Sequence, residues 1–252
     1  MRRPLALLLL ALLPLPLFGQ PKMPATAGGP KIVVAIPLGV KPGATTRLTL
    51  RGLKLDAATE VRCQEPKASA KLLKKGGASV PNQQDVNRVG NTEAQVEVTL
   101  PPDYPARTVT VTVLTPAGES LPHALLVDRG PVVAEKEPNN GFREAQPLAA
   151  GQEVQGAISQ NQDVDVYRFE GKAGQHVVAE VLAARYGSAL DSFLTLYDGE
   201  GRILASNDDS GGGPDSRVEL RLPRDGAYFL SVIDANDQGG PAHVYRLSLR
   251  LK

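Results

Sequence analysis

The sequence predicts an all-β protein built from two antiparallel β-sandwich domains that follow a cleaved signal peptide. Three observations predict this class. Runs in which apolar and polar residues alternate recur along the chain, and this period of two is typical of half-buried strands. The 25 glycines and 21 prolines among 252 residues separate the runs with turns. Hydrophobic residues make up 42% of the chain, which is enough for packed cores and too much for a disordered chain.

The first segment has the pattern of an export signal. Arg2 and Arg3 precede an uncharged, leucine-rich run that two prolines interrupt. This run is too short and too broken for a membrane-spanning helix, so we predict a signal peptide over residues 1–27. Cleavage after Gly19 and cleavage after Ala27 both remain open, and an N-terminal membrane anchor is the alternative. We expect a secreted, periplasmic or cell-surface protein with no membrane span in its mature chain.

The first domain is expected over residues 28–130. Its predicted strands are short alternating or apolar runs, at 31–36, 46–51, 95–100 and 108–113. The polar stretch from Gln64 to Asn91 lacks a period except at Ala68–Lys75. We expect this piece to form either a short basic helix or a solvated loop insertion. A further alternative is that its lysines form a weak contact surface for anions.

Cys63 is the only cysteine of the chain. A single cysteine excludes an intramolecular disulfide framework, a zinc site built on several thiolates and CxxC redox chemistry. Because Cys63 lies in an alternating apolar run, we expect a buried, inert thiol.

The second domain is expected over residues 131–252. Eight short runs predict its strands, at 154–158, 164–169, 176–183, 192–196, 202–206, 217–222, 227–233 and 243–251. The turns Asp198–Gly201 and Arg224–Gly226 have hairpin composition. Eight short strands with regular turn signals are typical of an antiparallel sandwich.

Charge is divided unequally between the two domains. The chain as a whole carries a net charge of +1, which offers no basic excess for nucleic acid. Residues 28–130 contain 13 basic and 9 acidic side chains, whereas residues 131–252 contain 12 basic and 18 acidic ones. The acids of the second domain gather in turns together with Asn, Gly and Ser, which suits metal ligation or turn capping.

An ordered series of motifs in the second domain resembles a known family. The series is Glu135-x-Glu137-Pro138-Asn139-Asn140, Asp163-Val164-Asp165-Val166-Tyr167-Arg168-Phe169, Asn207-Asp208-Asp209, Gly226-x-Tyr228 and Tyr245-Arg246-Leu247. It resembles the bacterial pre-peptidase C-terminal domain, or PPC domain, a jelly-roll-like sandwich related to the collagen-binding domains of clostridial collagenases. The first domain is more loosely similar to an immunoglobulin-like IPT/TIG module, and this pairing is similar to secreted proteins of planctomycete-like bacteria.

The resemblance implies a calcium site at the start of the second domain. The collagenase relatives bind calcium through a Glu-x-Glu-x-Asn-Asp segment and carboxylates near the strand that follows. The corresponding candidate ligands are Glu135, Glu137, Asn139, Asn140, Asp163 and Asp165. Ca²⁺ takes six to eight oxygen ligands, and residues two apart in an extended segment point to one side. Asn140 replaces an acid of the relatives and lowers the charge of the site. The alternative is a linker followed by a hairpin end.

A second acidic loop offers a weaker candidate. Asp208, Asp209 and Asp215 form either a second metal site or ordinary turns, because Asp and Asn in Gly-rich turns commonly bond their own backbone. The segment Asp234–Gly239 has part of the composition of an EF-hand loop but lacks its distal glutamate.

The sequence predicts a protein that is not an enzyme. Its three histidines are scattered, and it contains no G-x-S-x-G, H-E-x-x-H or Walker A motif. We expect a non-catalytic binding or adhesion protein, with an extracellular or envelope protein or polysaccharide as its partner and no nucleic acid. An accessory protein without a metal and a hydrolase based on the carboxylates of the second domain are the alternatives.

Export is directly testable. If residues 1–27 contain the signal, N-terminal sequencing of the mature protein will begin between Gln20 and Pro30. Recovery of the intact Met1 terminus from the cytosol would contradict the prediction.

Overall fold

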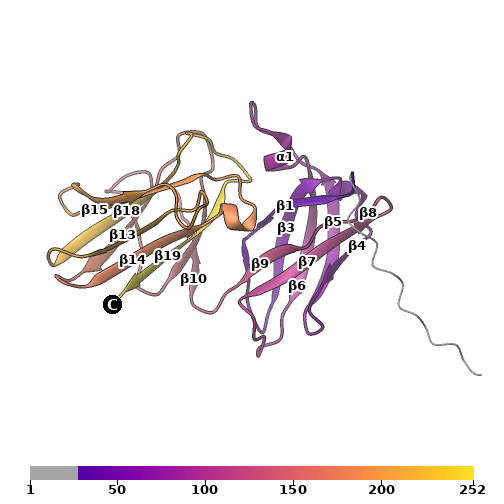
Figure 1. The fold of residues 1–252 in the computed structure, drawn as a ribbon, viewed down its shortest axis with the longest axis horizontal. Helices are drawn as coiled ribbons and strands as arrows, with labels where there is room; N and C mark the ends of the chain where they lie inside the picture. The colour runs from indigo at the N-terminus through magenta and orange to yellow at the C-terminus, as the bar shows by residue number, and fades with distance from the viewer. Residues whose placement is uncertain (1–27) are drawn as a thin grey trace, which may run out of the picture.

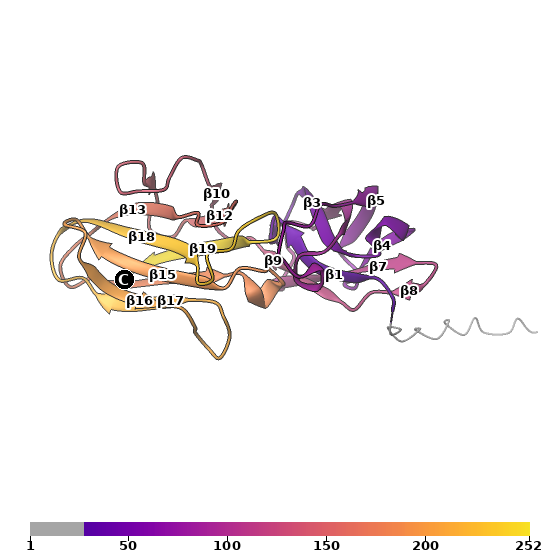
Figure 2. The same cartoon turned by 90° about the horizontal axis from the view of Figure 1, so that it is seen from above.

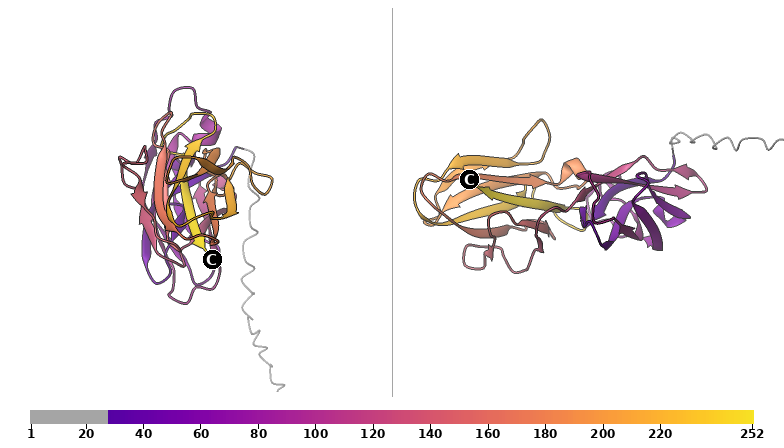
Figure 3. Two further views of the ribbon diagram at one scale, coloured as in Figure 1. Left: turned by 90° about the vertical axis from the view of Figure 1, so that its left-hand side faces the viewer. Right: turned by 90° about the horizontal axis from the view of Figure 1, so that it is seen from below.

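The computed structural model describes residues 28–252, so the signal peptide predicted over residues 1–27 lies outside the described part. Figure 1 shows two β-sandwiches placed end to end along the longest axis, and Figures 2 and 3 show the same arrangement from other sides. The predicted all-β class with two sandwiches is confirmed. One of the four sheets is purely antiparallel, and the other three are mixed because each also contains one parallel pair of strands. Within the described residues no helix is long and apolar enough to cross a membrane.

Two sheets form the first sandwich. One has the order β1 (Lys31–Ile36), β3 (Thr45–Leu53), β6 (Thr92–Thr99), β5 (Ser69–Gly77), and the other β2 (Gly39–Val40), β9 (His123–Val127), β7 (Thr108–Thr115), β4 (Glu60–Cys63), with β8 (Gly118–Glu119) beside β7. Alternate residues of these strands face inward, so that Val109, Val111 and Val113 of β7 are fully buried in one core. The short helices η1 (Leu55–Ala57) and α1 (Val86–Val89) lie in the connections.

The expectation for Ala68–Lys75 was wrong, because this piece is neither a helix nor a loop. It forms the edge strand β5, which pairs with β6 from Ser69 to Gly77. A bulge between Leu72 and Lys74 shifts the register and breaks the period of two, which hid the strand in the sequence. Exposed lysines on an edge strand also discourage pairing with other chains.

Cys63 ends β4 and is half-buried against the first core. Burial raises the pKa of its thiol to about 11. The thiol therefore stays protonated at neutral pH, as expected of an unreactive cysteine.

The second sandwich is built from two sheets of five strands each. One has the order β10 (Val132–Ala134), β12 (Glu153–Ala157), β19 (Val244–Leu251), β14 (His176–Leu182), β17 (Arg217–Arg221), and the other β11 (Gln146–Pro147), β13 (Asp165–Gly171), β18 (Gly226–Asp234), β15 (Ser192–Asp198), β16 (Ile203–Asn207). All eight predicted strands are present within two residues of their expected ends. The short strands β10 and β11 were not predicted, because two or three residues carry no measurable period.

The two sandwiches share a packed junction. A third apolar cluster combines Val34, Leu38 and Val89 of the first domain with Ala242 and Val244 of the second. The 3₁₀ helix η2 (Ala184–Tyr186) of the second domain also contacts this cluster. Apolar packing of this kind fixes the relative position of two domains more firmly than a polar contact does.

A buried arginine adds a polar tie to the same junction. Arg246 on β19 is 1% exposed and contacts Asp128 of the first domain at 2.9 Å and Glu153 at 3.1 Å. The Gln155 side chain on β12 accepts a hydrogen bond from the Leu38 backbone N–H at 3.1 Å. Because a buried charge is costly without a partner, Arg246 and Asp128 require the two domains to stay together.

Gly187 provides a test of the junction. It has φ of +85°, and a Cβ built on it would lie 1.9 Å from the Val33 carbonyl oxygen of the first domain. Gly211 is the matched control, because its φ is +66° and nothing lies within 4 Å of its Cβ position. We expect Gly211→Ala to cost only the backbone strain, about 1 kcal/mol, and Gly187→Ala to cost at least about 2 kcal/mol more in urea unfolding. Equal losses would contradict the described junction.

Candidate metal centre

Three carboxylates from two segments of the chain converge in the second sandwich. Glu135 follows β10, Glu137 lies two residues further on, and Asp165 begins β13. One oxygen of each lies within 4.8 Å of the others, and residues 28–252 contain no second group of this kind. Asp165 is fully buried, Glu135 is partly buried and Glu137 is exposed. The cluster therefore extends from the protein core to solvent.

Backbone hydrogen bonds hold the Glu135–Asn140 segment against the sandwich. The Glu135 N–H donates to the Gln155 carbonyl at 3.0 Å, and the Ala157 N–H donates to Glu135 Oε2 at 2.8 Å. Glu135 therefore extends the pairing of β10 with β12 by one residue. Further along, the Val166 N–H donates to the Asn139 carbonyl at 2.8 Å. The segment thus bridges β12 and β13, and this brings its carboxylates to Asp165.

Asn139 supplies an amide oxygen at the same place. It is fully buried, its Nδ2 donates to Glu135 Oε1 at 3.0 Å, and its backbone N–H donates to Glu137 Oε2 at 3.0 Å. Its Oδ1 has no hydrogen-bond partner, and neither has Asp165 Oδ1. A buried acceptor without a partner costs about 1–3 kcal/mol. Asn139 Oδ1 and the oxygens of the three carboxylates, among them Asp165 Oδ1, form an oxygen-only donor set of the kind that suits a hard divalent cation.

Two tyrosine hydroxyls close the buried side of the cluster, and sequence reasoning assigned them no role. Tyr245 Oη donates to Asp165 Oδ2 at 2.6 Å, and Tyr167 Oη lies 2.5 Å from Tyr245 Oη and 3.2 Å from Glu135 Oε1. Burial raises the pKa of both phenols well above the ordinary value, so both remain donors. The available signal was the period of two, which places Tyr167 on the same face of β13 as Asp165.

Burial also changes the protonation of Asp165. Desolvation raises the pKa of its carboxyl group well above the ordinary value, and the hydrogen bond and charge of Glu135 raise it further. At neutral pH, without a cation, the group therefore keeps a proton. A divalent cation at the cluster would have to displace this proton, and it would offset part of the negative charge of the three carboxylates.

The remaining predicted ligands do not join the cluster of carboxylates. Asp163 Oδ2 accepts hydrogen bonds from the Ser159 N–H at 2.7 Å and Oγ at 2.8 Å, so Asp163 caps a turn. Asn140 is exposed, and its Oδ1 accepts the Asn139 N–H at 3.2 Å. The structure thus gathers three of the four predicted carboxylates together with Asn139.

The second acidic loop has the arrangement of turns and anchors. Asp215 is fully buried and accepts hydrogen bonds from the backbone of Ala183 at 3.0 Å and Ala184 at 2.7 Å and from Arg185 Nε at 2.7 Å. Asp208 is exposed and accepts from the neighbouring Asp209 N–H. The hydrogen bonds of Asp215 satisfy its oxygens within the protein, so this loop favours the turn interpretation.

Comparison with known proteins finds a family match within the second sandwich. Residues 163–234 match the family model of the bacterial pre-peptidase C-terminal domain. The chain is 39% identical over 142 residues to a probable subtilase-type serine protease of Deinococcus radiodurans. The match covers 50% of the chain and 19% of that protein, so the chain spans about a fifth of the relative's length.

The solved structures to which the chain is similar share little sequence with it. They include the pre-peptidase C-terminal domain of a collagenase from Bacillus anthracis, 20% identical, with a TM-score of 0.34 and coverage of 46% of this chain and 100% of that domain. Another is the lysozyme inhibitor PliG of Aeromonas hydrophila, 15% identical, with a TM-score of 0.33 and coverage of 48% and 96%. A glucan-binding protein from Bacteroides ovatus, SGBP-B, is 11% identical, with a TM-score of 0.29 and coverage of 82% and 74%.

The protonation of Asp165 can be tested by its linkage to stability. The folded protein keeps a proton that the unfolded chain releases above about pH 4, so in EDTA the free energy of unfolding decreases as the pH rises above that value. Asp165→Asn keeps the shape and removes the titration. Between pH 5 and pH 8, wild type will lose up to about 1.4 kcal/mol per pH unit more than the variant in urea unfolding. Parallel pH profiles would contradict a protonated Asp165.

Proposed function

We propose that the protein is an exported, non-catalytic binding protein whose second domain binds Ca²⁺ through Glu135, Glu137, Asn139 and Asp165. The observation that carries this proposal is the convergence of three carboxylates, one of which has a buried oxygen without a hydrogen-bond partner, beside the equally unpartnered amide oxygen of Asn139. The resemblance to collagenase relatives supports the same residues. Asp163 and Asn140 are left out because their oxygens are used in local turns.

A non-catalytic role fits the chemistry of the histidines in the described part of the chain. Burial lowers the pKa of His123 to about 4 and also lowers that of His243, so neither is suited to act as a base. His176 lies at the surface beside Glu219, at 2.9 Å. The pre-peptidase C-terminal domain is a non-catalytic domain of peptidases. The proposal therefore assigns no protease activity from the Deinococcus relative.

The carboxylate-based hydrolase receives less support from the geometry. Asp165 is fully buried and accepts a hydrogen bond from the Tyr245 hydroxyl, so a substrate bond has no access to it. Glu135 uses its oxygens for the backbone of Ala157 and the amide of Asn139. Carboxylates held in this way stabilise a cation or a segment rather than transfer protons to a substrate.

Calcium would act on the attachment of one segment. When bound, the cation supplies positive charge that offsets the repulsion among the three carboxylates. Residues 135–140 would then stay against β12 and β13, and β12 also carries the Gln155 contact to the first domain. We propose that calcium in this way fixes the domain orientation in which an extracellular or envelope protein or polysaccharide is bound.

Calcium-dependent melting tests the proposal. A ligand that binds only the folded form stabilises it by RT ln(1 + [L]/Kd), about 2.7 kcal/mol at a hundredfold excess over Kd. Extracellular sites have a Kd on the order of 10⁻⁴–10⁻³ M, so the melting temperature of wild type will rise in millimolar Ca²⁺, rise less in Mg²⁺ and fall back with EGTA.

Two variants and one control locate the effect. Glu137→Ala and Asp165→Ala will each remove most of the calcium-dependent rise, because each removes a charged ligand. Glu170→Gln is the matched control, because Glu170 is exposed and pairs only with Arg168. A melting temperature of wild type that does not change with calcium would leave an accessory protein with a plain linker as the better account.

A further inference from the structure

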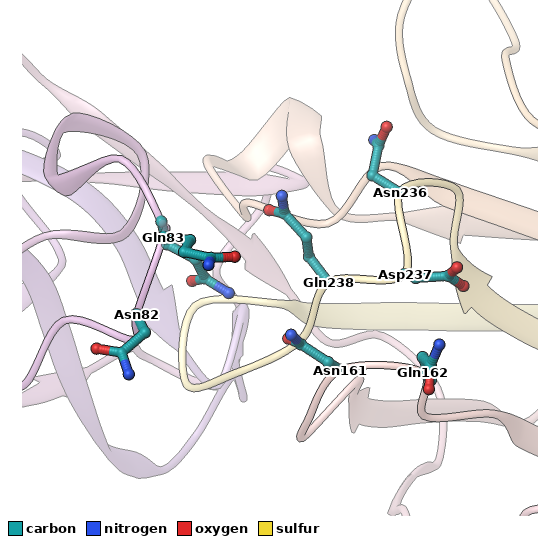
Figure 4. Close-up of a pocket in the computed structure, with 8 residues that line it drawn as sticks. Asn82, Gln83, Asn161, Gln162, Asn236, Asp237 and Gln238 are labelled. Atoms are coloured by element: carbon teal, nitrogen blue, oxygen red, sulfur yellow. The ribbon is translucent and has the colours of Figure 1, made fainter.

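A polar cleft lies between the two domains, away from the metal centre. Its volume is about 380 Å³, within the range of roughly 300–1,000 Å³ that is usual for small-molecule sites. Three loops line it, namely the loop before α1 in the first domain and the turns before β13 and after β18 in the second. Figure 4 shows that Asn82 and Gln83 approach from the first domain, and Gln238 and Asn161 from the second.

The lining of this cleft has an unusual chemistry. Seven of its eight residues are carboxamides and the eighth is a carboxylate: Asn82, Gln83, Gln84, Asn161, Gln162, Asn236, Gln238 and Asp237. Each carboxamide offers two N–H donors and an acceptor oxygen, which matches hydroxyl groups that both donate and accept. No lysine or arginine lines the cleft to bind an anion, and no apolar wall is present for an apolar ligand.

Backbone strain is concentrated at the same place. Four non-glycine residues between 28 and 252 have positive φ, and three of them, Gln83, Gln162 and Asp237, line the cleft with φ of 64°, 63° and 56°. Such conformations cost of order 1–3 kcal/mol each and persist where the surrounding structure enforces them, often at ligand sites. Here the turns brace each other, because the Gln162 N–H donates to the Asp237 carbonyl at 3.1 Å.

Gln84 provides an oriented acceptor in the lining. Its Nε2 donates to the Gly239 carbonyl of the other domain at 2.8 Å, and this contact fixes the amide across the junction. Its Oε1 is buried and has no hydrogen-bond partner. A ligand that donates a hydrogen bond to this oxygen would remove the free-energy cost of leaving a buried acceptor without a partner.

We propose that this cleft binds a neutral, hydroxyl-rich ligand, a short segment of an uncharged glycan. The inference rests on the proposed binding role and gives it a ligand class, and none of the proposed calcium ligands lines the cleft. A peptide added as a strand is disfavoured, because all eight lining residues lie in loops and offer no free strand edge. Because no aromatic ring lines the cleft for stacking, a few hydrogen bonds of ordinary strength give a Kd on the order of 1 mM.

Nuclear magnetic resonance of the mature protein tests this site, because the side-chain amide groups of the lining are themselves observable. The probes are cellotetraose, laminaritetraose and mannotetraose at millimolar concentration, with a heparin tetrasaccharide and a collagen-like peptide as probes of other classes. We expect at least one neutral tetrasaccharide to shift the side-chain signals of Gln84 and Gln238, and the heparin fragment and the peptide to leave them unchanged.

Variants separate a binding role from a structural one. Gln83→Ala and Gln238→Ala will each weaken binding about fivefold to tenfold, because each removes hydrogen bonds from one wall. Gln162→Gly relieves the positive φ, so it will weaken binding while the melting temperature stays the same or rises. Lys54→Gly is the matched control, because Lys54 has the same backbone conformation, with φ of 58°, but lies outside the cleft.

The outcomes distinguish this inference from the calcium proposal. Glu170→Gln, the control variant of the calcium proposal, will leave sugar binding unchanged because Glu170 is exposed and does not line the cleft. All sugar titrations are made in millimolar calcium, so that the domain orientation is the same in every sample. The inference is wrong if no neutral tetrasaccharide shifts the lining signals, if the shifts map elsewhere, or if Gln162→Gly binds as wild type does. None of these results bears on calcium-dependent melting.

Discussion

The second sandwich depends on how the buried carboxyl group of Asp165 is compensated. An isolated carboxylate inside a protein is strongly unfavourable, so it needs a proton, hydrogen bonds or a cation. Asp165 lies on β13 in one sheet, and its tyrosine donor Tyr245 lies on β19 in the other. One polar contact therefore ties the two sheets together at the end where the chain enters. The nearby Glu135 and Asn139 extend the same cluster to the surface.

Hydrogen bonds and packing along β12 link this cluster to the domain junction. Glu135 accepts a hydrogen bond from Ala157, which packs against the apolar cluster of the junction. On the same strand, Gln155 contacts both Leu38 of the first domain and the buried Arg246. Displacement of the Glu135 segment would therefore disturb the packing of β12 at the contact between the domains. The polar cleft between the domains rests on the same junction, since Gln84 bonds Gly239 across it.

Much of the architecture follows from the period of two, and the exceptions have physical causes. All eight long strands of the second domain could be predicted, whereas β5 was hidden by its bulge and β10 and β11 by their brevity. The period of two placed Glu135 and Glu137 on one side of an extended segment, and the resemblance to the collagenase relatives joined them in one candidate site with Asn139, Asn140, Asp163 and Asp165. Neither could show that Asp163 bonds Ser159 instead. The cleft was beyond prediction, because its lining comes from three loops that only the junction brings together.

At the proposed calcium site, a proton and a calcium ion compete for Asp165. Calorimetric titration with Ca²⁺ at pH 7, repeated in buffers with different ionisation enthalpies, measures the number of protons released on binding. Wild type is expected to release about one proton per calcium ion bound, because the raised pKa of Asp165 keeps its carboxyl group protonated in the absence of the ion. Binding with no proton release, or no binding in millimolar calcium, would contradict this competition.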